Sequence, residues 1–240
     1  MWRDDSKNVG VLSEREFVLN VDGRMVPGVV WAEDEVEPGQ PIVLLGHGGT
    51  THKRAEYLVQ VAMLLARRGV LAMAIDGPGH GERAGERDPS DRDSFELAWN
   101  EGGGTDAVVA DWRAALDFVS AELKTGKTGY WGLSMGTMMG LPVVANDERI
   151  TAALLGLMGN WGPNGDRLMA EAPNVACPVR FLMQWDDEVV PRASCLELFS
   201  TIGSKRKTLH ANPGLHSAVP AFEIRDSTDY LAGILKRKNG

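Results

Sequence analysis

The segment YWGLSMG, residues 130–136, surrounds one serine with glycines two positions away on either side. It lies where an apolar, strand-like run ends and a helical pattern begins. A sharp corner between a strand and a helix would press side chains at positions 132 and 136 against neighbouring backbone, and only glycine has no Cβ to collide there. The pattern therefore favours Ser134 as an exposed nucleophile, with an ordinary glycine-bordered turn as the alternative.

The composition limits the class of protein. The chain has 240 residues, of which 43% are hydrophobic, and this length predicts one α/β domain over residues 1–240. A net charge of −8 argues against nucleic acid as a partner, because phosphate binding needs clustered Lys and Arg. No apolar run reaches the roughly 18 residues of a membrane span, so a cytoplasmic protein without a membrane partner is expected. Cys177 and Cys195 are predicted to be buried thiols.

Apolar runs alternate with segments of helical period, which is typical of a mainly parallel sheet with helices on both faces. The first two strands alternate in polarity and should form an antiparallel hairpin, whereas the strands from residue 41 onward should be parallel. The eight expected strands are near 14–21, 25–33, 41–46, 70–75, 128–133, 151–157, 178–184 and 206–210. The expected helices are 54–68, 105–123, 135–146, 191–202 and 221–237.

Residues 82–104 fit neither period. This segment mixes dense charge with Phe95, Leu97 and Trp99. It is interpreted either as a solvated loop or as a flap over a site, since long loops in compact domains often carry function.

A serine hydroxyl needs a base to take its proton, and the base needs a carboxylate to hold its tautomer. Among five histidines, His216 lies in a loop after the last expected strand, where a base can reach over the edge of the sheet. His47 is the weaker candidate for the base, because its place beside glycines suits a residue that fixes a loop. The carboxylate should precede His216 in the chain, and Asp186, Asp187 and Glu188 all qualify by position.

Backbone N–H groups are suitable donors to the oxyanion that forms on a carbonyl oxygen, because they are rigid and already in place. One donor should be Met135, directly after the nucleophile. The other should come from the loop after the third expected strand, and Gly49 is the predicted donor there.

Five motifs follow expected strands in a fixed order. Together they resemble the serine hydrolases of the α/β-hydrolase superfamily over about residues 41–237. The motifs are GHGGT (46–50), DGPGHG (76–81), GLSMG (132–136), WDDEVVP (185–191) and NPGLHS (212–217).

The resemblance implies the α/β-hydrolase fold, with a mostly parallel eight-stranded sheet. It implies Ser134 as the nucleophile, His216 as the base and Asp187 as the acid, because the family places the acid four residues before the proline of this motif; Asp186 is the alternative. It implies Gly49 and Met135 as the oxyanion donors. No cofactor and no metal are expected, since no cluster of His, Cys and Asp has metal-ligand spacing.

The connection 158–177 is too short for the large cap that many superfamily members carry. With the antiparallel start, it resembles the dienelactone-hydrolase-like and small-carboxylesterase branch, although Ser134 replaces the cysteine nucleophile of dienelactone hydrolase. The expected substrate is a small or medium ester, cleaved through an acyl-enzyme. A thioesterase, a peptidase, a carbon–carbon bond hydrolase and a non-catalytic binding module are the alternatives. Trp99, Trp161 and Trp185 either line the substrate pocket or pack in the core.

Overall fold

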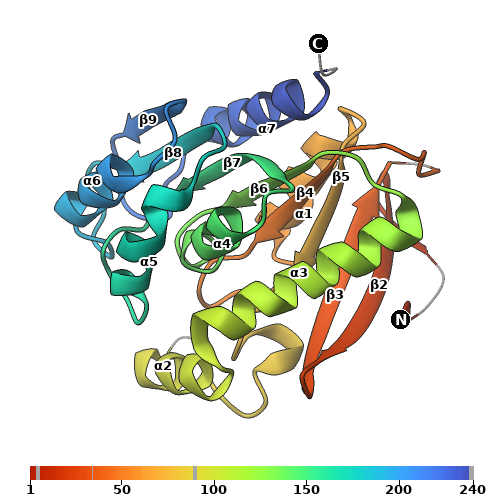
Figure 1. Ribbon diagram of the computed structural model, residues 1–240, viewed down its shortest axis with the longest axis horizontal. Coiled ribbons are helices and arrows are strands. Elements are labelled where there is room, and N and C mark those ends of the chain that lie inside the picture. Colours follow the sequence, from red (N-terminus) through yellow and green to blue (C-terminus); the bar gives the residue numbers. More distant parts are fainter. Residues whose placement is uncertain (4–5, 34, 89–90, 238–240) are drawn as a thin grey trace.

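The computed structural model describes residues 1–3, 6–33, 35–88 and 91–237. Within these residues one sheet of nine strands lies between two layers of helices (Figure 1). The strands are β1 (Lys7–Val9), β2 (Leu12–Val21), β3 (Arg24–Ala32), β4 (Ile42–Gly46), β5 (Leu71–Ile75), β6 (Thr128–Gly132), β7 (Ile150–Gly156), β8 (Val179–Gln184) and β9 (Lys207–Asn212). The helices are α1 (Glu56–Ala66), α2 (Arg92–Glu101), α3 (Gly104–Leu123), α4 (Met135–Asn146), α5 (Gly165–Glu171), α6 (Arg192–Thr201) and α7 (Ala221–Leu235), with short 3₁₀ turns η1 (Gly81–Arg83) and η2 (Ala172–Asn174).

The predicted α/β class, the opening hairpin and the parallel strands are confirmed. β2 and β3 pair in antiparallel register from Ser13↔Ala32 to Val21↔Arg24, and β4 onward pair in parallel with one another. The prediction of eight strands was one too few, because β1 adds an antiparallel edge to β2. β1 has only three residues and no buried side chain, so it lacks the alternation that identifies a strand in sequence.

The strand order, β1-β2-β3-β5-β4-β6-β7-β8-β9, reverses at β4. The chain proceeds from β4 to β5 on one side and then returns to place β6 on the other side. Ligands of open α/β sheets bind at the carboxyl ends of the strands at such a reversal. The loops that follow β4 and β6 are therefore neighbours at the expected binding edge.

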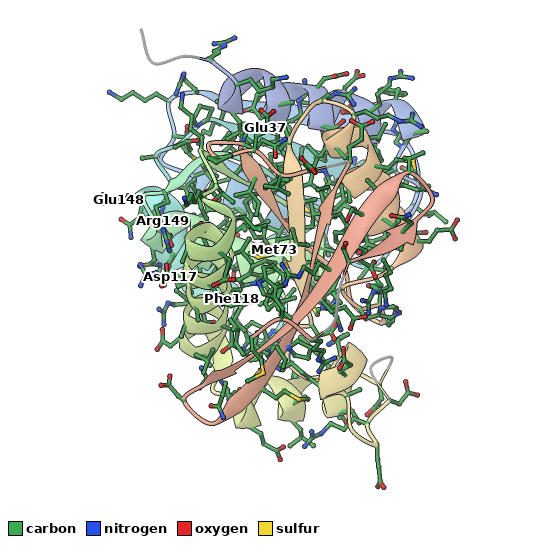
Figure 2. All side chains as sticks on the ribbon, turned by 90° about the vertical axis from the view of Figure 1, so that its right-hand side faces the viewer. Glu37, Met73, Asp117, Phe118, Glu148 and Arg149 are labelled. Carbon is green, nitrogen blue, oxygen red and sulfur yellow. The ribbon has the colours of Figure 1, made fainter. Side chains whose placement is uncertain are left out.

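Each face of the sheet has its own hydrophobic core. On one face α1 and α7 pack together, with Leu58, Leu65 and Leu231 fully buried. On the other face α3, α4, α5 and α6 cover a larger cluster that includes Met73 and Trp112. Figure 2 shows Met73 in the middle of the molecule, whereas Glu148 and Arg149 lie at its margin.

Two segments contain helices that the sequence did not predict. Residues 82–104 hold most of η1 and all of α2, and Asp91 caps α2 by accepting a hydrogen bond from the N–H of Ser94 at 2.9 Å. Residues 158–177 hold only α5 and η2 in the described chain, so no cap domain covers the sheet edge, as predicted. Among the described residues, no helix combines the length and the apolar character needed to cross a membrane.

Two glycines in helices, Gly136 in α4 and Gly233 in α7, differ in the space that surrounds them. Replacing each with alanine tests how tightly the backbone packs there. A Cβ at Gly136 would lie 2.4 Å from the carbonyl oxygen of Gly46, whereas a Cβ at Gly233 would meet nothing within 4 Å. We expect Gly136→Ala to lower the free energy of unfolding by several kcal/mol, because backbone on both sides must shift. Gly233→Ala should raise the free energy of unfolding by about 0.5–1 kcal/mol, since alanine loses less entropy in a helix.

Urea unfolding followed by circular dichroism measures both variants. Equal effects of the two substitutions would contradict the close packing of Gly136 against Gly46.

Candidate active site

Ser134 occupies a strained corner between β6 and α4. Its backbone has φ 57° and ψ −123°, a region that non-glycine residues rarely adopt. The flanking glycines are required sterically: a Cβ at Gly132 would lie 2.7 Å from the carbonyl oxygen of Gly136, and one at Gly136 would meet Gly46. The sharp turn predicted from YWGLSMG is therefore confirmed, and it lifts the serine above the sheet edge.

Three of the predicted site residues form one chain of hydrogen bonds. His216 Nε2 lies 2.9 Å from Ser134 Oγ, and His216 Nδ1 lies 2.8 Å from Asp187 Oδ2. The other oxygen of Asp187 accepts the N–H groups of Val189 and Val190 at 2.9 and 2.8 Å. Because a carboxylate can only accept, Nδ1 carries the proton and Nε2 is left to accept from the serine hydroxyl.

The two acids on either side of Asp187 bind the backbone of the loop that carries His216. Asp186 Oδ2 accepts the N–H of Gly214 at 3.2 Å, and Glu188 Oε2 accepts the N–H of His216 at 2.8 Å. Neither reaches the imidazole, so the alternative acid Asp186 contacts a glycine backbone instead. The sequence offered no signal for these backbone contacts.

The loop after β4 lies beside the corner at Ser134, because β4 and β6 pair as far as Gly46↔Gly132. In this loop the N–H of Gly48 donates to Tyr57 Oη at 2.6 Å. Within the described residues, the N–H groups of Gly49 and Met135 have no protein acceptor. The two predicted donors therefore lie on adjacent segments, and neither N–H group donates a hydrogen bond within the described part of the chain.

His47 joins the loops that follow β4 and β5. Its Nδ1 donates to the carbonyl of Gly48 at 2.8 Å, and its Nε2 accepts the N–H of Gly77 at 2.9 Å. Burial, and to a smaller extent the nearby His80, lowers the pKa of His47 to about 4. Both ring nitrogens are occupied, so His47 fixes the loop as predicted and is not placed to act as the base.

A buried ion pair secures the same two loops, and sequence reasoning missed it. Lys53 Nζ lies 2.7 Å from Asp76 Oδ2 and 2.5 Å from Glu82 Oε1. Burial alone would raise the pKa of Asp76, but the hydrogen bonds from Lys53 outweigh it and hold that pKa below its usual value. Gly81 makes this possible, since a Cβ there would lie 2.3 Å from Asp76 Oδ1.

The three tryptophans expected near the site differ in exposure. Trp99 is 3% exposed and packs on Phe95 with ring centroids 6.0 Å apart. Trp161 is 37% exposed and Trp185 is 48% exposed, with the guanidinium of Arg192 4.3 Å above the Trp185 ring. Within the described residues, no group of three or more His, Cys, Asp or Glu side chains is arranged to hold a metal ion.

Comparison with solved structures identifies similar proteins. A cold-adapted esterase from an Arctic intertidal metagenomic library, in complex with polyethylene glycol, is 58% identical, with a TM-score of 0.92 and coverage of 98% of this chain and 100% of the other. An acetyl xylan esterase from Paenibacillus sp. R4 is 17% identical, with a TM-score of 0.74 and coverage of 97% and 87% respectively, and it shares the fold.

A third structure, Est1E from Butyrivibrio proteoclasticus with bound ferulic acid, also shares the fold. It is 16% identical, with a TM-score of 0.69 and coverage of 92% of this chain and 100% of the other. No family model matches the chain, and no curated protein matches it. The identity of 58% over nearly the whole length, together with the corner at Ser134 and the strand order, decides the assignment. The chain belongs to the α/β-hydrolase superfamily and, within it, to the esterases.

Proposed function

We propose that this carboxylic ester hydrolase acts through Ser134 as nucleophile, His216 as general base and Asp187 as the residue that orients the base. The observation that carries the proposal is the continuous chain of hydrogen bonds from Ser134 Oγ through the imidazole to Asp187 Oδ2, at 2.9 and 2.8 Å. Nucleophile, base and orienting acid within hydrogen-bonding reach are the requirement for activating a serine. The side chain of His216 is 16% exposed, so it can meet a substrate.

The first half of the reaction forms an acyl-enzyme. Ser134 Oγ attacks the ester carbonyl while His216 Nε2 takes the hydroxyl proton, and Asp187 stabilises the imidazolium that results. The negative charge on the carbonyl oxygen is met by the N–H groups of Gly49 and Met135, which are uncommitted within the described residues. Collapse of the intermediate breaks the bond to the alcohol oxygen, and His216 returns the proton to the departing alcohol.

The second half regenerates the enzyme. A water molecule gives a proton to His216 Nε2 and attacks the acyl carbon, the same two N–H groups bind the oxyanion, and the acid leaves as Ser134 Oγ recovers its proton. The substrate we propose is a small-molecule ester of small or medium size, as expected from the resemblance of the short connection 158–177 to the small-carboxylesterase branch. The cytoplasm is the proposed compartment, where Cys177 and Cys195 would stay as the free thiols that they are here.

Hydrolysis of p-nitrophenyl esters from acetate to dodecanoate tests the function. We expect rates to be highest for short acyl chains and to fall as the chain lengthens. Ser134→Ala should lower kcat by at least about 10³-fold, because a triad without its nucleophile retains only the contribution of binding and the oxyanion donors. Undiminished hydrolysis by folded Ser134→Ala protein would refute the nucleophile.

A pair of asparagine variants tests the choice between neighbouring acids. Asp187→Asn should lower kcat by about 10⁴-fold, because the amide would favour the wrong tautomer of His216. Asp186→Asn, the matched control, should change kcat by less than about tenfold, since among the described residues the Asp186 carboxylate accepts a hydrogen bond only from the backbone N–H of Gly214. Steady-state kinetics on p-nitrophenyl acetate measure both, and the reverse order of effects would exclude Asp187 as the orienting acid.

Tyr57 is the proposed positioning residue for the loop that carries Gly49. Tyr57→Phe removes the acceptor of the Gly48 N–H, and we expect kcat to fall roughly tenfold with little change in KM, since the oxyanion forms after binding. Tyr230→Phe on α7 is the matched control and should leave kcat unchanged. A rise in KM at constant kcat for Tyr57→Phe would mean that the tyrosine serves substrate binding instead.

A further inference from the structure

The side chain of Gln184 lies against the loop that carries His216, and the reaction proposed above gives it no role. Gln184 is the last residue of β8, which pairs with β9 as far as Gln184↔Asn212, so the loop after β9 begins beside it (Figure 1). The residue is only 2% exposed. A buried amide costs free energy unless hydrogen bonds satisfy it, so its partners indicate what it does.

The amide nitrogen of Gln184 donates to both ends of the turn around His216. Nε2 donates to the carbonyl of Ala218 at 2.9 Å and, more weakly, to the carbonyl of Leu215 at 3.3 Å. The N–H of Ala218 donates to the same Leu215 carbonyl at 2.9 Å, which closes a four-residue turn with His216 as its second residue. Gln184 therefore holds the first and the last carbonyl of the turn that presents the base.

The orientation of this amide follows from its partners. Turning it over would set Oε1 against two carbonyl oxygens, neither of which offers a hydrogen. Gly214 gives the amide room, because a Cβ at this position would lie 3.2 Å from Gln184 Nε2. Gly214 also has φ 121°, a conformation that residues with a side chain rarely adopt. The glycine and the amide thus fit together next to the turn.

Two acids of the same segment hold the N–H groups of this loop. Asp186 accepts the N–H of Gly214, and Glu188 accepts that of the base itself, His216. Gln184 does the opposite, since it donates to carbonyl groups. A carboxylate can only accept, so neither acid could take over this role. The short segment after β8 therefore satisfies donors and acceptors of the histidine loop with separate side chains.

We propose that Gln184 is a positioning residue for the general base, which keeps the imidazole of His216 between Ser134 and Asp187. The inference rests on the proposed function, because Gln184 acts through the base of that reaction. The imidazole makes contacts of 2.9 Å to Ser134 and 2.8 Å to Asp187, so a shift of the turn toward one partner lengthens the contact with the other. A misplacement of about 1 Å can lower a rate about 10²-fold.

Gln184→Met tests the role, because methionine keeps the length of the side chain and removes the donor. We expect kcat on p-nitrophenyl acetate to fall about 10- to 100-fold, with KM changed less than about twofold, since the base acts in the transition state and not in binding the ester. Gln184→Glu keeps the size of the amide and, when ionised, offers no hydrogen. It gives the same test with the same expected result if Gln184→Met does not fold.

Asn164→Leu is the matched control, because it also removes a buried amide. Asn164 is 6% exposed, and its Nδ2 donates to the carbonyl of Met138 at 3.0 Å and to Thr105 Oγ1 at 3.4 Å. This amide therefore makes the same number of hydrogen bonds from its nitrogen, and neither goes to the histidine loop. Thermal unfolding shows that each variant is folded at the assay temperature, and only the change at Gln184 should lower kcat.

Proton NMR gives a readout that a loss of stability alone would not change. The Nδ1 proton of His216 is hydrogen-bonded to a carboxylate, Asp187, so its resonance lies far downfield, and Asp187→Asn identifies it by its loss. We expect folded Gln184→Met to broaden or lose this resonance and Asn164→Leu to retain it.

An unchanged kcat in the folded Gln184 variant would overturn the positioning role, as would an equal loss of kcat in Asn164→Leu or an unaltered His216 resonance. Hydrolysis that persists in Ser134→Ala would instead refute the proposed function. The resonance would then still show whether Gln184 holds the imidazole against Asp187.

Discussion

The contact between Gly136 and the carbonyl of Gly46 is the constraint on which the arrangement of this site depends. A Cβ at position 136 would lie 2.4 Å from that oxygen, so only glycine lets the first turn of α4 lie against the end of β4. The buried hydroxyl of Tyr130 reinforces the contact by donating to the carbonyl of Gly136 at 2.7 Å. Because of this close approach, Ser134 and the loop bearing Gly49 lie at one edge of the sheet, which a common oxyanion requires.

Buried polar groups fix the loops after β4 and β5, which no strand or α-helix holds. His47 spans two loops with both ring nitrogens occupied, and the Lys53–Asp76 pair ties the same loops together beneath it. His47, Lys53 and Asp76 are tolerated at this depth because each has its partner. The proposed oxyanion donors are therefore held before a substrate arrives, and little reorganisation is needed when charge develops.

The sequence predicted best what depends on spacing along the chain. The corner at Ser134 follows from two glycines, and the parallel strands follow from apolar runs that are buried on both faces. α2 and α5 were missed for different reasons. α5 has seven residues, too few to establish a period, whereas α2 is mostly polar and packs Phe95 against His80 in the loop after β5, a tertiary interaction that propensity does not report.

Three adjacent acids follow β8. The order of the sequence motifs located them near the proposed site but could not show which of them contacts His216. By position alone Asp186, Asp187 and Glu188 are equivalent candidates, yet only Asp187 reaches the imidazole, while the others accept N–H groups of Gly214 and His216. The loop bearing the histidine contains no regular structure at that point, so its own backbone bonds cannot hold it. The imidazole of His216 stays oriented toward Ser134 only if the backbone of its own loop is fixed. Asp187 therefore sets the tautomer of His216, and its two neighbours hold the backbone of the histidine loop. This division of roles appears only once the loop after β8 meets the loop after β9.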